Sequence, residues 1–233
     1  MKILVLGDSF SFGSELSDLP VVEFGPHGND YWDPVSMQNK FVEASQLSWP
    51  SVLAKIMDCE VTNLSLPGGS NDRIFRLAVK HTVWRSFDVI ICAWTAPDRI
   101  DITSNGKDLA IGLHQNWHRT FPWIKEFMHL HWDAARSDIN SVTKMLALQS
   151  FLSQQQQKYL YVKSFDFQFA SAARSMAQHL DLTHCVDWQG SLVDWAAGYD
   201  FGPHGHFLEQ GHCAVAQRMA QELQVRFKAT STS

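Results

Sequence analysis

The strongest signal for the fold is Lys2-Ile3-Leu4-Val5-Leu6-Gly7-Asp8-Ser9-Phe10, which lies almost at the start of the chain. The run from residue 2 to residue 6 is short, apolar after its lysine and bounded by Gly7, which is the pattern of a buried strand. A serine directly after such a strand lies at the carboxyl edge of a sheet, where open α/β folds place their sites. Ser9 is therefore the first candidate for a functional side chain.

A second segment, His206-Phe207-Leu208-Glu209-Gln210-Gly211-His212, lies near the other end of the chain and places a histidine just before a predicted terminal helix. A serine hydroxyl is a weak nucleophile and needs a neighbouring base. Ser9 as nucleophile with His206 as base predicts a serine hydrolase.

Apolar strands alternate with helices along the chain. The expected strands are 2–6, 61–66, 88–94 and 159–162, and the expected helices are 49–57, 71–84, 133–157, 170–180 and 208–228. Helices that separate apolar strands indicate βαβ units, and hence a three-layer α/β/α sandwich with a mostly parallel sheet covered on both faces. We expect a single domain over 1–233, with irregular insertions at about 18–48 and 100–132.

Composition excludes several classes of protein. Apolar residues make up 45% of the 233 residues and charged residues 18%, which indicates a substantial core rather than disorder. The net charge of −5 and the lack of a basic run argue against nucleic acid as a partner. No apolar run approaches membrane-spanning length, and the start of the chain is too short for a signal-peptide core, so we expect a cytoplasmic protein. The four cysteines form no CxxC pair and are expected to be buried thiols, with disulfides as the alternative.

Three blocks, in order, resemble the SGNH/GDSL hydrolase family: Gly7-Asp8-Ser9, then Asn63-Leu64-Ser65-Leu66-Pro67-Gly68-Gly69-Ser70, then His206 with Gly211-His212. The resemblance covers essentially the whole chain and implies a flavodoxin-like sheet. It also implies that Ser9 attacks an acyl ester, and that the Ser9 amide forms an oxyanion hole with Gly68, or with the neighbouring Gly69. Short acyl esters and O-acetylated carbohydrates are the implied substrates, with hydrolysis or acyl transfer as the reaction.

Between the second of these blocks and His206 the family has a further block, the third along the chain, in which an asparagine donates to the oxyanion, and here the sequence departs from the family pattern. This chain has Ala93-Trp94-Thr95-Ala96-Pro97-Asp98-Arg99 there. Thr95 takes roughly the asparagine position and can donate through its hydroxyl, and Asn71 or a backbone amide are alternatives. Arg99 is either a ligand for a substrate anion or a surface residue. We expect Asn71, Arg99 and Trp94 to be the candidates for contact with substrate.

The last block departs as well, because Pro203 stands three residues before His206, where the family places an aspartate. Asp200 is the nearest acid, and a Gly-Pro turn can fold it back onto the imidazole. Alternatively, a backbone carbonyl orients the ring and leaves a Ser9–His206 dyad. His204 is the competing base.

Two further interpretations compete with this one. His204, His206 and His212 form an HxH-containing set that can bind zinc, and so can the pair His129 and His131. The segment of His204 and His206 shows no clear strand that would hold the two imidazoles around one ion. His129 and His131 are surrounded by tryptophans, which suggests an aromatic lid. We therefore expect no metal and no cofactor. The second alternative is a ligand- or glycan-binding protein on the same scaffold, with weak or lost catalysis and an aromatic segment at 114–132. The intact serine and histidine favour the enzyme.

Overall fold

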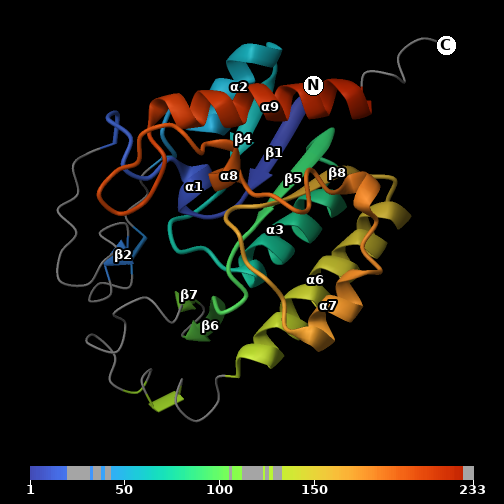
Figure 1. The fold of residues 1–233 in the computed structure, drawn as a ribbon. Coiled ribbons are helices and arrows are strands. Elements are labelled where there is room, and N and C mark those ends of the chain that lie inside the picture. Colours follow the sequence, from blue (N-terminus) through green and yellow to red (C-terminus); the bar gives the residue numbers. More distant parts are fainter. Residues whose placement is uncertain are drawn as a thin grey trace.

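The fold is built on one parallel sheet, seen in a computed structural model that describes residues 1–19, 32–33, 38–39, 43–104, 107–111, 123, 126–127 and 133–227. Its strand order is β4-β1-β5-β8 (Figure 1). The bounds are β1 Lys2–Leu6, β4 Glu60–Asn63, β5 Val89–Trp94 and β8 Lys158–Lys163. Counted in chain order these strands run 2-1-3-4, which is the order of flavodoxin-like folds. The predicted α/β class with a mostly parallel, flavodoxin-like sheet is confirmed.

The register of the sheet brings the functional blocks together. Leu4 lies opposite Thr62 on one side and Ile90 on the other, and β5 pairs with β8 over its whole length. All four strands are parallel, so their carboxyl ends share one edge of the sheet. The segments after β1, β4 and β5 carry the first three sequence blocks, and all of them begin at that edge.

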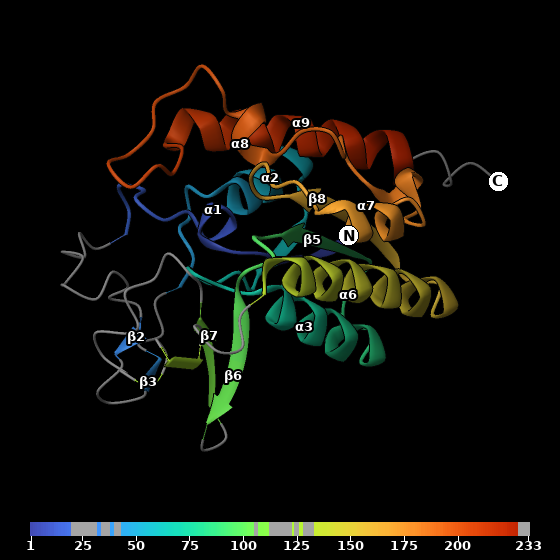
Figure 2. The same cartoon turned by 60° about the horizontal axis from the view of Figure 1, so that its bottom comes forward.

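Helices cover both faces of the sheet. α2 (Trp49–Met57) and α9 (Glu209–Phe227) pack on one face, and α3 (Asn71–Val83), α6 (Ala134–Gln154) and α7 (Ser171–Ala177) lie on the other (Figure 2). Side chains of a strand alternate between faces. Ile3 and Val5 accordingly join the core beneath α2 and α9, whereas Leu4 and Leu6 join the core beneath α3 and α6. Burial on both faces explains why β1 and β5 read as continuous apolar runs.

Element bounds agree with expectation within a few residues, with informative exceptions. β4 ends at Asn63 rather than at residue 66, because the Asn63 side-chain oxygen accepts the Ser65 N–H and turns the chain. Within the insertion expected to be irregular, β6 (Ile100–Ser104) and β7 (Lys107–Ile111) form an antiparallel hairpin. Three short elements escaped prediction because none spans enough residues to show a period: α1 (Ser9–Phe12), α8 (Leu192–Trp195) and the 3₁₀ helix Leu182–His184.

In the other insertion, β2 (Trp32–Asp33) pairs with β3 (Gln38–Asn39). His129, His131 and most of the aromatic segment 114–132 lie outside the described residues. None of the helices in the described ranges combines the length and apolarity needed to cross a bilayer. All four cysteines are free thiols; Cys92 and Cys185 are buried as expected, whereas Cys59 is half-buried and Cys213 is exposed.

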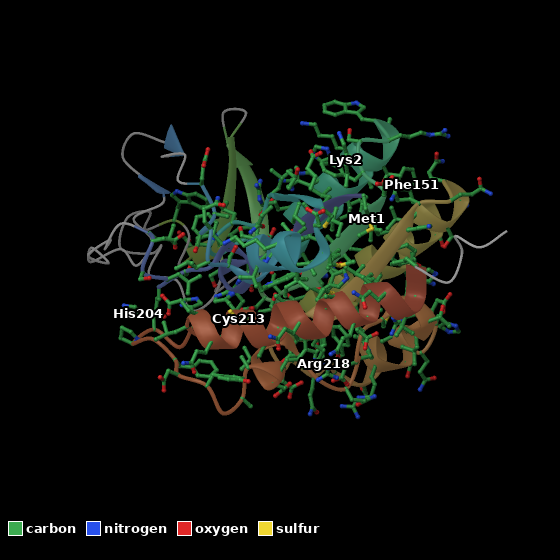
Figure 3. The ribbon with its side chains drawn as sticks, turned by 90° about the horizontal axis from the view of Figure 1, so that it is seen from above. Met1, Lys2, Phe151, His204, Cys213 and Arg218 are labelled. Carbon is green, nitrogen blue, oxygen red and sulfur yellow. The ribbon has the colours of Figure 1, made fainter. Side chains whose placement is uncertain are left out.

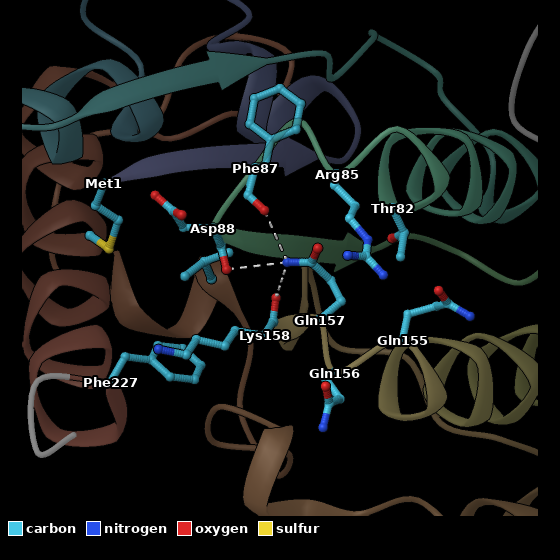
Figure 4. Close-up of a pocket in the computed structure, with 11 residues that line it drawn as sticks. Met1, Thr82, Arg85, Phe87, Asp88, Gln155, Gln156, Gln157, Lys158 and Phe227 are labelled. Carbon is cyan, nitrogen blue, oxygen red and sulfur yellow. Dashed lines mark hydrogen bonds between the residues drawn. The ribbon is translucent and has the colours of Figure 1, made fainter. Parts of the chain in front are cut away.

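The amino edge of the sheet is closed by Gln157, far from the functional blocks. Its side-chain amide donates to the carbonyls of Phe87, Asp88 and Lys158 and so ties the start of β5 to the start of β8 (Figure 4). A cavity of about 520 Å³ opens there, lined also by Met1 and Phe227. Figure 3 shows Met1 and Lys2 well apart from His204, which belongs to the other edge of the sheet. This cavity is therefore separate from the candidate site.

His212 joins α9 to α2. Its imidazole is fully buried, and Nδ1 accepts the N–H of Trp49, the first residue of α2, at 2.9 Å. The first N–H groups of a helix have no intrahelical acceptor, so this contact satisfies one of them. Because Nδ1 accepts, the ring is neutral with its proton on Nε2. Burial, with the nearby His206, lowers the pKa of His212 to about 3.

This burial predicts a pH-dependent stability. The unfolded chain protonates its histidines near pH 6.5 and the folded His212 does not, so the unfolded state binds more protons as the pH falls from about 6.5 toward 3. The contribution of His212 to the free energy of unfolding is present in full above about pH 6.5. We expect this free energy to fall by roughly 1.5 kcal/mol between pH 6.5 and pH 5. Urea unfolding at several pH values measures it. In His212→Asn, whose amide oxygen can still accept from Trp49, the free energy of unfolding should change less with pH. The same pH dependence in the variant and the wild type would show that His212 is not the group responsible.

Candidate active site

Ser9 is placed at the carboxyl edge of the sheet by the turn between β1 and α1. Asp8 caps α1, because its side-chain Oδ1 accepts the N–H of Phe10 at 3.1 Å. Gly7 has no room for a side chain, since a Cβ there would lie 2.7 Å from Ser11 Oγ. Gly13 ends the helix in a left-handed conformation, with its N–H on the Ser9 carbonyl. The resulting tight turn leaves Ser9 largely buried, with 7% of its surface exposed.

His206 lies directly against this serine. Its Nε2 is 2.8 Å from Ser9 Oγ, which is hydrogen-bonding distance. The imidazole packs against the ring of Phe10, with the two ring centroids 5.0 Å apart. The structure therefore brings together the two residues that the sequence placed at opposite ends of the chain.

Glu15, a residue that sequence reasoning missed, occupies the other side of the imidazole. Its Oε2 is 2.7 Å from His206 Nδ1, and only 6% of its side chain is exposed. Glu15 itself adopts a left-handed backbone conformation (φ 69°), which a non-glycine residue rarely does. A carboxylate on Nδ1 fixes the tautomer that leaves Nε2 free to accept a proton.

The loop before α9 wraps around the Glu15 carboxylate. The backbone N–H of His204 donates to Oε1 at 2.9 Å, and that of His206 donates to Oε2 at 3.1 Å. Gly202 must be glycine, because a Cβ there would lie 2.7 Å from Oε1. Burial raises the pKa of Glu15, but the hydrogen bonds from His204 and His206 outweigh it, so the pKa lies below its usual value. The group is therefore a carboxylate at neutral pH.

The geometry corrects the expectation for Asp200. This residue is exposed, and its backbone carbonyl accepts the N–H of Leu208. The Gly-Pro turn exists, as the Gly202 N–H donates to the His206 carbonyl at 2.8 Å. It folds the loop around Glu15 instead of returning Asp200 to the imidazole. The backbone N–H of His204 donates to the same carboxylate, whereas the imidazole of His206 contacts Ser9.

The turn after β4 supplies the other wall of the site. Gly68 has a φ of 71°, which favours glycine, and the neighbouring Leu66 N–H donates to the carbonyl of Gly7 at 3.2 Å. This bond fastens the turn beside the serine. Within the described residues, the backbone N–H groups of Ser9 and Gly68 have no acceptor. Gly69 differs, because its N–H donates to the carbonyl of Leu66.

Thr95 is not a free donor, contrary to expectation. It is fully buried, and its hydroxyl donates to Asp8 Oδ2 at 2.7 Å. A hydroxyl has one proton, so nothing remains for an oxyanion. The buried Asp8 carboxylate requires such partners, which explains why Thr95 turns inward.

Asn71 and Trp94, which were expected to contact substrate, are both buried. The Asn71 carboxamide is buried, exchanges two 3.0 Å hydrogen bonds with the backbone of Thr95 and donates a third to Ser141. Trp94 is fully buried in the core beneath α3 and α6, edge-on to Tyr161 at 5.2 Å. Asn71 thus joins three elements at the edge of the sheet, and Trp94 is a core residue.

Arg99 stands beside the serine turn. Its NH1 is 3.1 Å from Asp8 Oδ2 and 2.7 Å from Thr95 Oγ1, and 20% of the side chain is exposed. Asp8 is completely buried, so this ion pair compensates a charge that would otherwise be costly.

Across the described ranges, no three His, Cys, Asp or Glu residues are gathered as metal ligands.

Comparisons with known proteins agree with this fold. The chain belongs to the family of unknown function DUF6071, whose model matches residues 33–217. Among solved structures it is similar to LAE5, an alpha/beta hydrolase enzyme from the metagenome of Lake Arreo, Spain, at 10% identity and a TM-score of 0.53, over 97% of this chain and 95% of that one. It is also similar to TesA, at 9% identity and a TM-score of 0.51, over 97% and 100%.

A third similar structure is a carbohydrate esterase family 2 enzyme plus carbohydrate binding domain from Corynascus thermopiles (Myceliophthora fergusii). It is 13% identical with a TM-score of 0.52, over 97% of this chain and 66% of that one. No curated protein matches the sequence. At these identities the similarity establishes the fold alone, and it is a fold that esterases use. The chemistry has to be argued from the residues of the site.

Proposed function

We propose that this protein is a serine ester hydrolase of the SGNH/GDSL type, with Ser9 as nucleophile, His206 as general base and Glu15 as the acid that orients the imidazole. The observation that carries the proposal is the continuous contact from Glu15 Oε2 through both nitrogens of His206 to Ser9 Oγ, at 2.7 and 2.8 Å. A hydroxyl, an imidazole and a carboxylate in this order are the arrangement that activates a serine for acyl transfer.

The reaction proceeds in two halves. In the first, Ser9 Oγ attacks the ester carbonyl while His206 Nε2 takes the hydroxyl proton, and the same nitrogen then gives that proton to the leaving alcohol. In the second, water attacks the acyl-Ser9 ester, again with His206 as base. The Glu15 carboxylate stabilises the imidazolium that forms in each half. Its cradle of backbone N–H donors keeps it ionised for that role.

The oxyanion is stabilised by backbone donors. The Ser9 and Gly68 N–H groups, which have no acceptor in the described part of the chain, are available to a negatively charged oxygen. Each such donor is worth about 3 kcal/mol in the transition state. The SGNH/GDSL family has an asparagine donor in its third block. Thr95 stands there in this chain, and its hydroxyl donates to Asp8 instead of to the oxyanion.

The proposed substrate is a small acyl ester, with an O-acetylated carbohydrate as the first to try. Support comes from neighbours with the same fold, which include the carbohydrate esterase above and an acetyl xylan esterase, Est2A, from Butyrivibrio proteoclasticus, at 10% identity and a TM-score of 0.50. A purely ligand-binding protein would not require the serine–histidine–carboxylate contacts.

The test is hydrolysis of 4-nitrophenyl acetate and release of acetate from acetylated xylan, with the Ser9→Ala variant beside the wild type. We expect the wild type to cleave at least the activated ester and Ser9→Ala to lose about 10³- to 10⁶-fold in kcat, as loss of the nucleophile does in serine hydrolases. Equal rates for the two proteins would refute the proposal.

A further inference from the structure

Arg99 is held through one nitrogen of its guanidinium, NH1. NH1 contacts Asp8 Oδ2 at 3.1 Å and Thr95 Oγ1 at 2.7 Å, and it lies 3.5 Å from the carbonyl of Gly69. Its guanidinium carbon also lies 5.5 Å from the centre of the Phe165 ring, within cation–π range. These contacts fix both the position and the plane of the group.

The other edge of the guanidinium is uncommitted. Within the described part of the chain, Nε and NH2 of Arg99 make no hydrogen bond, although the side chain is only 20% exposed. The three N–H donors of these two nitrogens thus have no acceptor among the described residues. A planar edge of this kind matches the two oxygens of a carboxylate or phosphate group.

This edge lies beside the segments that carry the proposed active site. Asp8 precedes the serine, and Gly69 follows the glycine whose N–H we assign to the oxyanion hole. The Phe165 ring lies 5.8 Å from that of Phe10, which in turn packs on His206. The contacts of Arg99 thus run to three of the segments that surround Ser9.

We propose that Arg99 is an anion subsite beside Ser9, and that the substrate is an ester carrying a carboxylate or phosphate group near the scissile bond; the substrate class, though not the anion binding, rests on the proposed function. The negative charge of Asp8 cancels the positive charge of Arg99 at longer range. Recognition of the anionic group therefore depends on two short, parallel hydrogen bonds from the guanidinium rather than on long-range electrostatic attraction. A lysine, which keeps the charge but not the planar fork, should therefore bind the anion poorly.

Binding is tested without turnover in the Ser9→Ala background, by titration with succinate, inorganic phosphate and the neutral analogue succinamide. We expect succinate or phosphate to bind and succinamide not to, and we expect the affinity to fall about tenfold or more in Ser9→Ala/Arg99→Lys. Whichever anion binds more tightly identifies the group. Equal binding of succinamide, or an affinity unchanged by Arg99→Lys, would overturn the subsite.

Kinetics provide an independent test with two matched esters, mono-4-nitrophenyl succinate and 4-nitrophenyl butyrate. The ratio of their kcat/KM values should favour the anionic ester and fall about tenfold in Arg99→Lys. Arg218→Lys alters another arginine–carboxylate pair, with Asp187, and should keep the wild-type ratio. If neither ester is cleaved while anion binding persists, the proposed function fails and the subsite stands. If both are cleaved without preference, the subsite fails.

Arg99→Lys can also disturb the buried Asp8. Thermal unfolding checks the variant, and the wild type offers a measurement that needs no mutation. The Nε–H resonance of Arg99 should shift on addition of succinate or phosphate and stay in place with succinamide. A resonance that ignores both anions would overturn the proposal even if the variant does not fold.

Discussion

Replacing His206 by alanine is expected to lower kcat for ester hydrolysis by about three to six orders of magnitude, as removal of a triad member does. The imidazole is the only described group within hydrogen-bonding distance of Ser9 Oγ, at 2.8 Å, so without it the hydroxyl has no base. Steady-state rates with 4-nitrophenyl acetate measure the loss.

His204→Ala is the matched control. His204 serves the site through its backbone N–H, which donates to Glu15 and which alanine retains. The variant should keep its kcat within about tenfold of the wild type. A larger loss in His204→Ala than in His206→Ala would move the base to His204 and contradict the geometry.

The second large effect is expected from Glu15→Gln. Three donors point at the two carboxylate oxygens of Glu15, namely the His204 N–H, the His206 N–H and His206 Nδ1–H. An amide replaces one of these oxygens by an NH₂ group, which sets a donor against a donor and favours the wrong imidazole tautomer. We expect a loss of up to about 10⁴-fold in kcat with little change in KM.

Asp200→Asn is the control for this experiment, because Asp200 stands nearest in sequence among the acids before His206 but is exposed in the fold. Its kcat should stay close to that of the wild type. Circular dichroism shows whether both variants fold. A nearly wild-type Glu15→Gln enzyme would mean that Ser9 and His206 act as a dyad, and a severe loss in Asp200→Asn would restore the acid that the sequence suggested.

Much of the fold is predictable from the sequence because it rests on local patterns. The apolar runs of β1 and β5 and the helical periods between them depend only on burial, which leaves its mark residue by residue. Ser9 and His206 are predictable for a related reason, since each stands at the end of a recognisable element. The β6–β7 hairpin lacks such a mark, because it lies in a segment whose composition indicates no regular element.

The rest of the site depends on contacts between distant segments. Glu15 meets His206 only because α1 ends in a left-handed turn and Gly202 leaves space for a carboxylate, and neither feature appears in the spacing of the acids. The one available signal was that Glu15 follows the serine closely enough to return to it. Thr95 has the right spacing for an oxyanion donor, but its hydroxyl donates its hydrogen bond to the buried Asp8 carboxylate instead. Competition for a hydrogen bond is invisible in a linear pattern.

The central claim is that Ser9 is a nucleophile activated by His206 and Glu15, and a fluorophosphonate probe tests it most directly. Mass spectrometry of the intact wild type should show a single adduct, and peptide mapping should place it on Ser9. Ser14→Ala, which removes a buried hydroxyl without a hydrogen-bond partner among the described residues, should label like the wild type. Ser9→Ala should remain unlabelled while folded. Labelling that persists in Ser9→Ala, or a wild type that does not react, would contradict the account.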